Sequence, residues 1–312
     1  MNAIDKILLL LDKEPPAPEL LEKIVLVAKK YGAKLELFEC CYNRSLVSSY
    51  LFDTQGAARA KQGYLHGEEK RLQAVADQLE AKGVEVTIDV AWEVDAEQGI
   101  LTKIERYKPD LVVKSCRYHH RLAEFIFGNL DWQLVRHCSV PLLLIRPALW
   151  GATPVVITAL DPLQEKQRPA HLDDVVLRSG EALVAHLGGI LHLFSAYQAL
   201  PTAVVFDDTL MLNFEDLRSR LAEQHHQAMD DLLAGHGLTL SAPEVHLAHG
   251  EVHKELPRYA AEVKADIVVM GGMERDPGTR LFVGSTTENV LDHLESDVLV
   301  VRAGGAGGTI ER

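Results

Sequence analysis

The residues with the clearest chemical potential lie near the carboxyl end of the chain. Gly271 and Gly272 follow an apolar run of strand length. Gly284, Ser285 and Thr286 stand where a helical pattern begins. Backbone N–H groups and hydroxyls at a helix N-terminus bind phosphate, and the helix dipole adds to the attraction. The pattern indicates a phosphate site, although ordinary helix capping explains Ser285 equally well.

The histidines form no recognisable metal pattern. His246, His249 and His253 are spread over a predicted strand, loop and helix, so their rings need not converge and no metal is expected there. His225 and His226 lie on a predicted helix, where sequence neighbours do not share a face. We expect both of them to face solvent.

Signatures of catalysis are also missing. The chain has no nucleophile elbow, no H-E-x-x-H motif and no P-loop with its lysine. This favours a protein that is not an enzyme. Catalytic triads need not be close in sequence, so an enzyme stays open as an alternative.

The charge balance excludes two classes of partner. The 312 residues include 32 Lys and Arg against 45 Asp and Glu, a net charge of -13. Nucleic acids and anionic membranes select basic patches, so neither is expected. Residues 1–156 hold 20 basic and 21 acidic side chains, and residues 157–312 hold 12 and 24. An anionic ligand is therefore easier to place in the first half.

Cysteine usage and hydropathy predict a soluble cytoplasmic protein. The four cysteines lack the spacing of a metal knuckle, and a disulfide framework is not expected in a chain of this length. No stretch of 18 uncharged apolar residues could span a membrane, and the N-terminus has no leader pattern.

An internal repeat organises the chain. With an offset of 156, Asp110-Leu-Val-Val aligns with Asp266-Ile-Val-Val, Gly128 with Gly284 and Arg146 with Arg302. The offset is half the chain, which indicates a duplicated domain. We predict domains at 1–149 and 150–303, followed by a flexible Gly-rich tail at 304–312.

Each copy alternates strands with helices, which indicates βαβ units and a parallel sheet. The predicted fold is α/β, with two tandem doubly wound, Rossmann-like domains of five strands each. The ten strands are expected at 7–11, 35–41, 84–92, 111–114, 141–146, 154–160, 190–196, 242–248, 266–271 and 297–302. Ligands of such folds bind at the carboxyl ends of the strands.

These motifs carry a family resemblance. Gly271, then Glu274, then nine residues and Gly284-Ser285 keep the spacing G-x-x-G-(nine residues)-G-[S/T] of nucleotide-binding universal stress proteins. The chain resembles a tandem universal stress protein, most nearly of the bacterial E-type, two-domain subfamily. The resemblance implies that Asp12 and Asp161, which end the first strand of each copy, lie at the adenine end of a nucleotide site. It also implies that the two halves pack as a pseudo-dimer, with a further homodimer left open.

The second copy departs from the family motif at Glu274, which replaces the middle glycine. A carboxylate about 4 Å from a phosphate opposes it by about 4 kcal/mol per charge pair at an effective dielectric of about 20. ATP is therefore expected to bind weakly or not at all in this half. The competing interpretation is that Glu274 holds Mg²⁺ and assists binding.

The first copy departs further. Ser115 and Tyr118 stand at the first two glycine positions, while Gly128 and Asn129 match the later pair. We predict that this copy has lost the standard nucleotide site. Lys114 and residues 117–121 form a basic cluster in sequence, which either binds an anion other than ATP, contacts another domain or is simply solvated.

Three functions follow from these observations. The favoured one is a non-enzymatic stress-response protein that binds a small ligand, either a nucleotide or another anion. The alternatives are a slow ATPase or nucleotidyl-transfer enzyme acting in the second half, and an interaction scaffold without a ligand.

Overall fold

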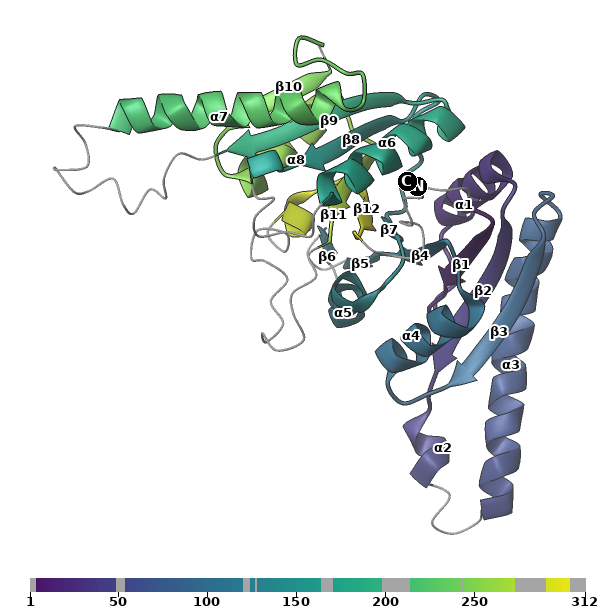
Figure 1. Cartoon of the computed structure of the whole chain (residues 1–312). Helices are drawn as coiled ribbons and strands as arrows, with labels where there is room; N and C mark the ends of the chain where they lie inside the picture. The colour runs from purple at the N-terminus through teal and green to yellow at the C-terminus, as the bar shows by residue number, and fades with distance from the viewer. Residues whose placement is uncertain are drawn as a thin grey trace. The chain divides into compact units, whose positions relative to one another are not determined.

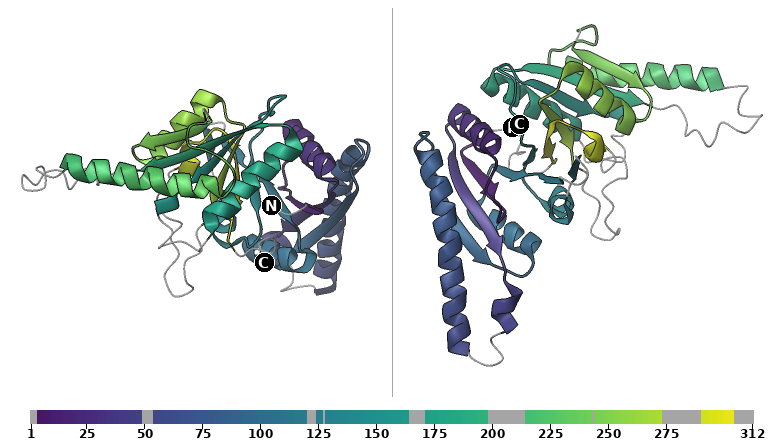
Figure 2. Two further views of the ribbon diagram at one scale, coloured as in Figure 1. Left: turned by 45° about the horizontal axis from the view of Figure 1, so that its top comes forward. Right: turned by 180° about the vertical axis from the view of Figure 1, so that it is seen from behind.

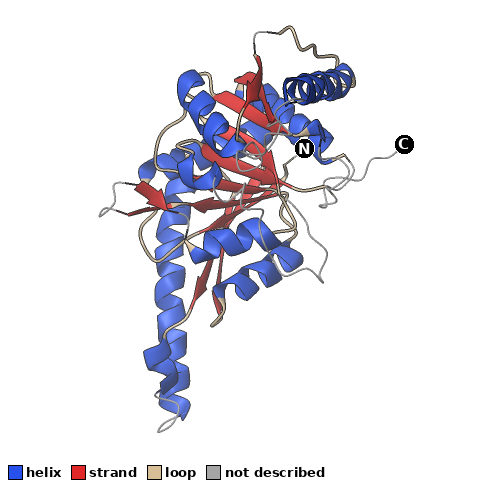
Figure 3. Cartoon of the chain, turned by 90° about the vertical axis from the view of Figure 1, so that its left-hand side faces the viewer, coloured by secondary structure: helices blue, strands red, loops and turns tan. Residues whose placement is uncertain are grey.

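The chain divides into two compact units, residues 2–150 and 151–312, which are the N-terminal and C-terminal halves below. The structure is a computed structural model (Figure 1). It describes residues 4–48, 54–119, 124–126, 128–163, 171–197, 214–242, 244–272 and 290–303. Within each half the strands lie between helices (Figure 3).

The N-terminal half contains a five-stranded parallel sheet in the order β7-β4-β1-β2-β3. Its strands are β1 (Lys6–Leu10), β2 (Lys34–Cys41), β3 (Val86–Trp92), β4 (Leu111–Ser115) and β7 (Leu142–Ile145). Its helices are α1 (Pro18–Tyr31), α2 (Arg44–Ser48), α3 (Thr54–Glu80), α4 (Ala96–Tyr107) and α5 (Asn129–His137). The strand order reverses between β1 and β4, which is where ligands of doubly wound sheets bind.

The C-terminal half repeats this arrangement in the order β12-β11-β8-β9-β10. Its strands are β8 (Val155–Leu160), β9 (Ile190–Tyr197), β10 (Val245–His249), β11 (Ile267–Gly271) and β12 (Asp297–Val301). Its helices with described bounds are α6 (Leu172–Leu187), α7 (Phe214–Ala234) and α8 (Val252–Val263). The predicted fold of two tandem five-stranded, parallel α/β domains is confirmed.

One carboxylate in each half anchors the start of the first strand. Oδ2 of Asp110 accepts hydrogen bonds from the backbone N–H groups of Asp5 and Lys6, both at 2.9 Å. Asp266, 156 residues later, accepts the N–H groups of Gly151 at 2.9 Å and Val155 at 2.8 Å. The sequence repeat is therefore also a repeat of hydrogen bonds.

Helices cover both faces of the N-terminal sheet. Neighbouring strand residues point to opposite faces. On β2, Glu39 meets Arg71 of α3, whereas the ring of Phe38 lies under the amine of Lys103 of α4, 5.5 Å from the ring centroid. Hence α3 and α4 lie on opposite faces. The first turns of α3, together with α2, extend beyond the carboxyl ends of the strands (Figure 2).

Some elements were not predicted. Helix α2, which follows β2 closely, was not expected from the sequence. Strands β5 (Arg117–His119) and β6 (Glu124–Ile126) pair antiparallel as a separate two-stranded sheet, where the sequence suggested only a basic loop.

Candidate functional site

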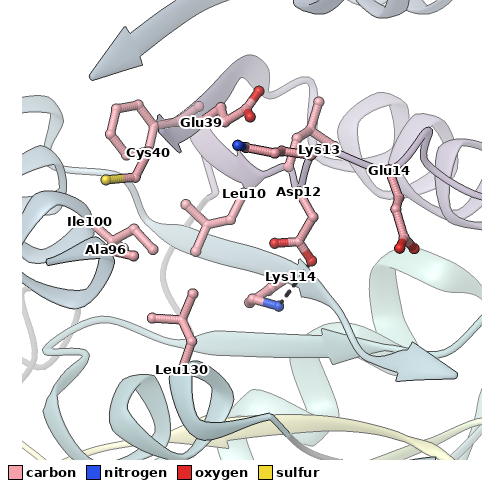
Figure 4. Close-up of a pocket in the computed structure, with 12 residues that line it drawn as sticks. Leu10, Asp12, Lys13, Glu14, Glu39, Cys40, Ala96, Ile100, Lys114 and Leu130 are labelled. Atoms are coloured by element: carbon pink, nitrogen blue, oxygen red, sulfur yellow. Dashed lines mark ion pairs between the residues drawn. The ribbon is translucent and has the colours of Figure 1, made fainter. Parts of the chain in front are cut away.

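A cavity of about 380 Å³ opens at the carboxyl ends of β1, β2 and β4 in the N-terminal half (Figure 4). Parallel register brings its walls together, because Leu10 of β1 lies beside Phe38 of β2 and Lys114 of β4. Ile100 of α4 and Leu130 of α5 complete an apolar enclosure. The polar residues that also line it are Asp12, Lys13, Glu14, Glu39, Cys40 and Lys114.

A buried ion cluster forms the floor of this cavity. The amine of Lys114 lies 2.8 Å from Oδ1 of Asp131 and 3.6 Å from Oδ2 of Asp12. The side chains of Lys114 and Asp131 are 4% and 2% exposed, and that of Asp12 is 23% exposed. Burial lowers the pKa of Lys114, but the two carboxylates raise it by more, so the pKa lies above its ordinary value. Lys114 is therefore a cation.

Asp131 also caps helix α5. Its Oδ2 accepts a hydrogen bond of 2.7 Å from the N–H of Gly128, the residue that precedes the helix. Gly128 and Asn129 thus stand at a helix N-terminus, as the motif suggested, but a carboxylate of the chain itself already occupies that place. An acid three residues after the N-cap is one half of a capping box, the half that a glycine N-cap still allows, and this spacing could have identified Asp131 in the sequence.

The predicted basic cluster is wrong for one of its members. Lys114 lies in β4, within the expected strand 111–114, but its amine is buried against Asp131 and is neither solvated nor open to an external anion. Ser115 ends the same strand, and Tyr118 lies in β5. His120 and Arg121 lie outside the described residues.

The two thiols next to the cavity are not nucleophiles. Burial, followed by the charges of Glu93 and Asp95, raises the pKa of Cys40 to about 11. Burial, followed by the charge of Glu68, raises the pKa of Cys41 to about 11. Both thiols are therefore protonated near neutral pH.

A second ion group lies on the face of β2 that packs against α3, opposite the face that carries Phe38, and its Glu39 also lines the cavity. Arg71 pairs with Glu39 and, at 2.9 Å, with Glu68. The side chain of Glu39 is 2% exposed. This acid is thus held by an internal partner.

At the carboxyl ends of the strands of the C-terminal half, the structure describes only some of the residues. The N–H of Asp161, just after β8, donates to Oδ1 of Asp173 at 3.2 Å. Gly271 ends β11, where a Cβ would lie 2.8 Å from Cδ2 of Leu172. The side chain of Leu172 on α6 would therefore have to shift to admit a larger residue at this position. The predicted site residues Glu274, Gly284, Ser285 and Thr286 lie outside the described residues.

His225 was predicted to face solvent, and this prediction is wrong. The residue is 1% exposed, and its Nε2 lies 2.9 Å from Oγ of Ser195 on β9. Ser195 in turn donates to the carbonyl of Leu160 at 2.8 Å. Burial, and then the charge of His226, lowers the pKa of His225 to about 4. The imidazole is therefore neutral, and it fastens α7 to the sheet.

The other histidines of the C-terminal half have separate surroundings. The ring of His246 stacks on Tyr259 at 4.1 Å, and that of His249 lies edge-on to Tyr197 at 5.4 Å. Across the described ranges, no three His, Cys, Asp or Glu side chains are arranged to hold a metal ion.

Comparison with known proteins assigns the family. The sequence model of the Universal stress protein family matches residues 3–146 and 171–302, once in each half. The chain belongs to the universal stress protein family. It is thus a protein of the stress response, and the predicted resemblance is confirmed.

Two relatives match almost end to end. Universal stress protein E of Photorhabdus laumondii is 24% identical over 307 residues, covering 98% of this chain and 97% of that protein. Universal stress protein E of Escherichia coli K12 is also 24% identical over 307 residues, with coverage of 97% and 95%. The E-type, two-domain resemblance is thus confirmed along nearly the whole chain.

Solved structures show the same fold. A functionally unknown protein from Pseudomonas aeruginosa PAO1 has a TM-score of 0.73 at 23% identity, covering 96% of this chain and 93% of that one. A universal stress protein from Archaeoglobus fulgidus has a TM-score of 0.67 at 19% identity, with coverage of 97% and 99%. Among the helices that the structure describes, none is long and apolar enough to cross a membrane.

Proposed function

We propose that this universal stress protein is not an enzyme and that it binds one small molecule in the cavity of its N-terminal half. The position of the cavity carries the proposal, since it lies at the switch point between β1 and β4. Its volume of about 380 Å³ falls in the usual range of ligand pockets. Apolar walls around a few fixed polar groups are typical of sites for small molecules.

The proposed ligand carries no polyphosphate. The groups that would receive a phosphate, the N–H of Gly128 and the amine of Lys114, are already bound by Asp131. A phosphate at the same place would lie against Asp131 and Asp12. Each such charge pair costs about 4 kcal/mol at roughly 4 Å and an effective dielectric of about 20.

A nucleotide site belongs, in this proposal, to the C-terminal half alone. ATP would bind there through the residues 271–286, weakly because of Glu274, or with Mg²⁺ held by that carboxylate. We place the protein in the cytoplasm, which is supported by its four free cysteines, because such thiols suit a reducing compartment.

Native mass spectrometry of the purified full chain tests the cavity. We expect the wild type to carry a small-molecule adduct and Ala96→Trp, which fills the cavity from α4, to lose it. Ala81→Trp places the same side chain at an exposed position outside the cavity and should keep the adduct. An adduct that persists in Ala96→Trp would place the ligand elsewhere. A wild type without any adduct would favour the ligand-free scaffold, and ATP turnover would favour the enzyme.

A further inference from the structure

We propose that Asp131 fills an anion site inside the N-terminal half and thereby restricts the neighbouring cavity to ligands without an anionic group. The inference rests on the proposed function, because it names the class of molecule that the same cavity takes. Its basis is how the carboxylate of Asp131 is held, and which residues the C-terminal half has at the matching positions.

The carboxylate of Asp131 is bound on both of its oxygens. Oδ1 lies 2.8 Å from the amine of Lys114, and Oδ2 accepts the N–H of Gly128 at 2.7 Å. A lysine amine and an N–H at the start of a helix are groups with which proteins bind anions. The side chain of Asp131 is 2% exposed. The anion held here is therefore part of the chain itself.

Three oxygens of the chain surround the amine of Lys114. They are Oδ1 of Asp131 at 2.8 Å, the carbonyl oxygen of Ser115 at 3.2 Å and Oδ2 of Asp12 at 3.6 Å. The carboxylate of Asp12 and the amine of Lys114 face each other in Figure 4. An ammonium group has three N–H donors. An anion that approaches Lys114 must therefore displace one of these oxygens.

This displacement makes anions poor ligands of the cavity. Lys114 and Leu130 line the cavity, and Asp131 is the next residue after Leu130. If an anion took the place of Asp131, a buried carboxylate would lose its cation, and Gly128 would lose its acceptor. Leaving a buried charge without its partner is strongly unfavourable. A ligand without an anionic group avoids this cost.

The C-terminal half has uncharged residues at both positions. With the offset of 156, Lys114 aligns with Met270 and Asp131 with Thr287. Met270 lies in β11 and is 7% exposed, whereas Thr287 lies outside the described residues. The lysine and the acid thus differ together between the halves, as expected if each needs the other inside the protein.

Rescue by formate tests the inference. Asp131→Ala removes a carboxylate, and formate is a free carboxylate of the same size. We expect formate to stabilise the full-length variant with an apparent affinity about tenfold or more above that for the wild type, measured as the rise in melting temperature with concentration. Formamide, which is uncharged, and chloride at equal ionic strength should not do so. Equal responses of both proteins to formate, or no response of the variant, would overturn the inference.

Two variants show whether the rescue needs this site. Combining Asp131→Ala with Lys114→Met removes the amine as well and should abolish the response to formate. Asp95→Ala removes an exposed carboxylate that caps α4, and formate should not stabilise this variant. A response of either protein as large as that of Asp131→Ala would refute an anion site at Lys114.

Benzoate and benzamide, which have nearly one shape, test the selection in the cavity. We expect the wild type to bind benzamide about tenfold or more tightly than benzoate in calorimetric titration, and Asp131→Ala to lose or reverse this preference. A merely structural role of Asp131 would weaken both probes equally. That result, or a wild type that binds benzoate as well as benzamide or binds neither, would overturn the restriction to ligands without an anionic group.

Two further results keep the proposals separate. If Asp131→Ala folds only with formate present, that requirement is itself the rescue. If it does not fold at all, Asp131→Thr, which introduces the residue found 156 positions later, tests the same claim and should bind benzoate about tenfold more tightly than the wild type. A small-molecule adduct on the wild type together with a failed rescue would leave the ligand cavity standing and refute only the internal anion.

Discussion

The two halves build the same sheet around different chemistry. In the N-terminal half, Glu36 of β2 is paired with Lys103 of α4, with side chains only 10% and 5% exposed. The residues 156 positions later are His192 and Tyr259, which share a neutral hydrogen bond of 2.8 Å between Nδ1 and the phenol oxygen. A buried ion pair in one half is thus a polar aromatic pair in the other.

The neighbouring strand follows the same rule. Asp89 lies beside Phe38 in register and meets Lys103 at 2.7 Å. His246 lies beside Phe194 in the same way, and its ring stacks on Tyr259. The N-terminal core is therefore charged where the C-terminal core is aromatic.

A third difference between the halves lies on the other face of each sheet, where α3 and α7 pack. Glu39 with Arg71 is matched by Ser195, also 156 residues later, with His225. A buried ion pair fails badly when one member is lost, because the other charge remains buried. We infer that the N-terminal half depends on complete sets of charges, whereas the C-terminal half depends on packing and on histidines that stay neutral.

The largest expected effect comes from breaking a set of charges. Lys103→Tyr introduces the residue found 156 positions later and leaves Glu36 and Asp89 without their buried cation. We expect unfolding in urea to show a loss of about 3–5 kcal/mol.

Two comparisons sharpen this result. The triple variant Glu36→His, Asp89→His, Lys103→Tyr should recover most of the loss, because no unpaired charge remains buried and Arg106, which also pairs with Asp89, is exposed. Lys34→Met breaks an exposed pair with Glu85 and should cost less than about 1 kcal/mol. A single variant as stable as the wild type would show that the buried charges are not interdependent.

The second effect is a response to acid in the C-terminal half. The folded pKa of His225 is about 4 and its unfolded value is near 6.5, so the unfolded chain binds the extra proton between these values. Stability should therefore fall as the pH drops from about 6.5 to 4.

His225→Gln removes this proton uptake while offering Ser195 an N–H donor. Between pH 7 and 4.5 the wild type should lose about 2 kcal/mol more unfolding free energy than the variant. Identical pH profiles of the two proteins in urea denaturation would mean that His225 is not held neutral.

The third effect concerns the segment beyond β11. If Glu274 opposes phosphates, Glu274→Gly should raise ATP affinity tenfold or more, which corresponds to about 1.4 kcal/mol. Added salt should reduce the difference in ATP affinity between the wild type and the variant, because salt screens the repulsion. Calorimetric titration with ATP, with and without magnesium, shows whether Glu274→Gly raises or lowers the ATP affinity. Tight magnesium-dependent binding by the wild type that is lost in the glycine variant would contradict the repulsion and make Glu274 a cation ligand.

The smallest effect compares two matched helix starts. Asp95 caps α4 by accepting the N–H of Gln98 at 3.2 Å, whereas Glu251, 156 residues later, makes no side-chain cap bond on α8. Asp95→Ala should cost about 1 kcal/mol of unfolding free energy. Glu251→Asp, which supplies the shorter side chain, should stabilise its half. A cost for Glu251→Ala as large as that for Asp95→Ala would contradict this difference.

The fold was predictable because its signals are local. Apolar runs of strand length alternate with helical stripes, and the offset of 156 repeats both. Strand β4 was found this way, and its run Leu111–Val113 is buried. The hairpin of β5 and β6 was not found, because each of its strands has only three residues, too few to show a strand pattern.

The site was less predictable, because burial of a charged side chain depends on a partner elsewhere in the chain. Lys114 follows an apolar run and faces Asp131 across 17 positions of sequence, so neither residue alone reveals the pair. The polar partner of the buried His225 is Ser195, which lies on a different element 30 residues away in sequence. Asp12 was singled out, but through family resemblance rather than through its own surroundings.

The exchange of charged for aromatic groups also bears on how the chain folds correctly. Tandem copies of one domain are prone to misassembly, in which a segment of one copy is built into the other. Strand β2 inserted in place of β9 would bury Glu36 against Tyr259 and leave Lys103 without that partner. Each such swap leaves buried charge unpaired, which penalises the wrong assembly more strongly than apolar mismatches would. The different core residues of the two halves therefore favour assembly of every strand into its own half.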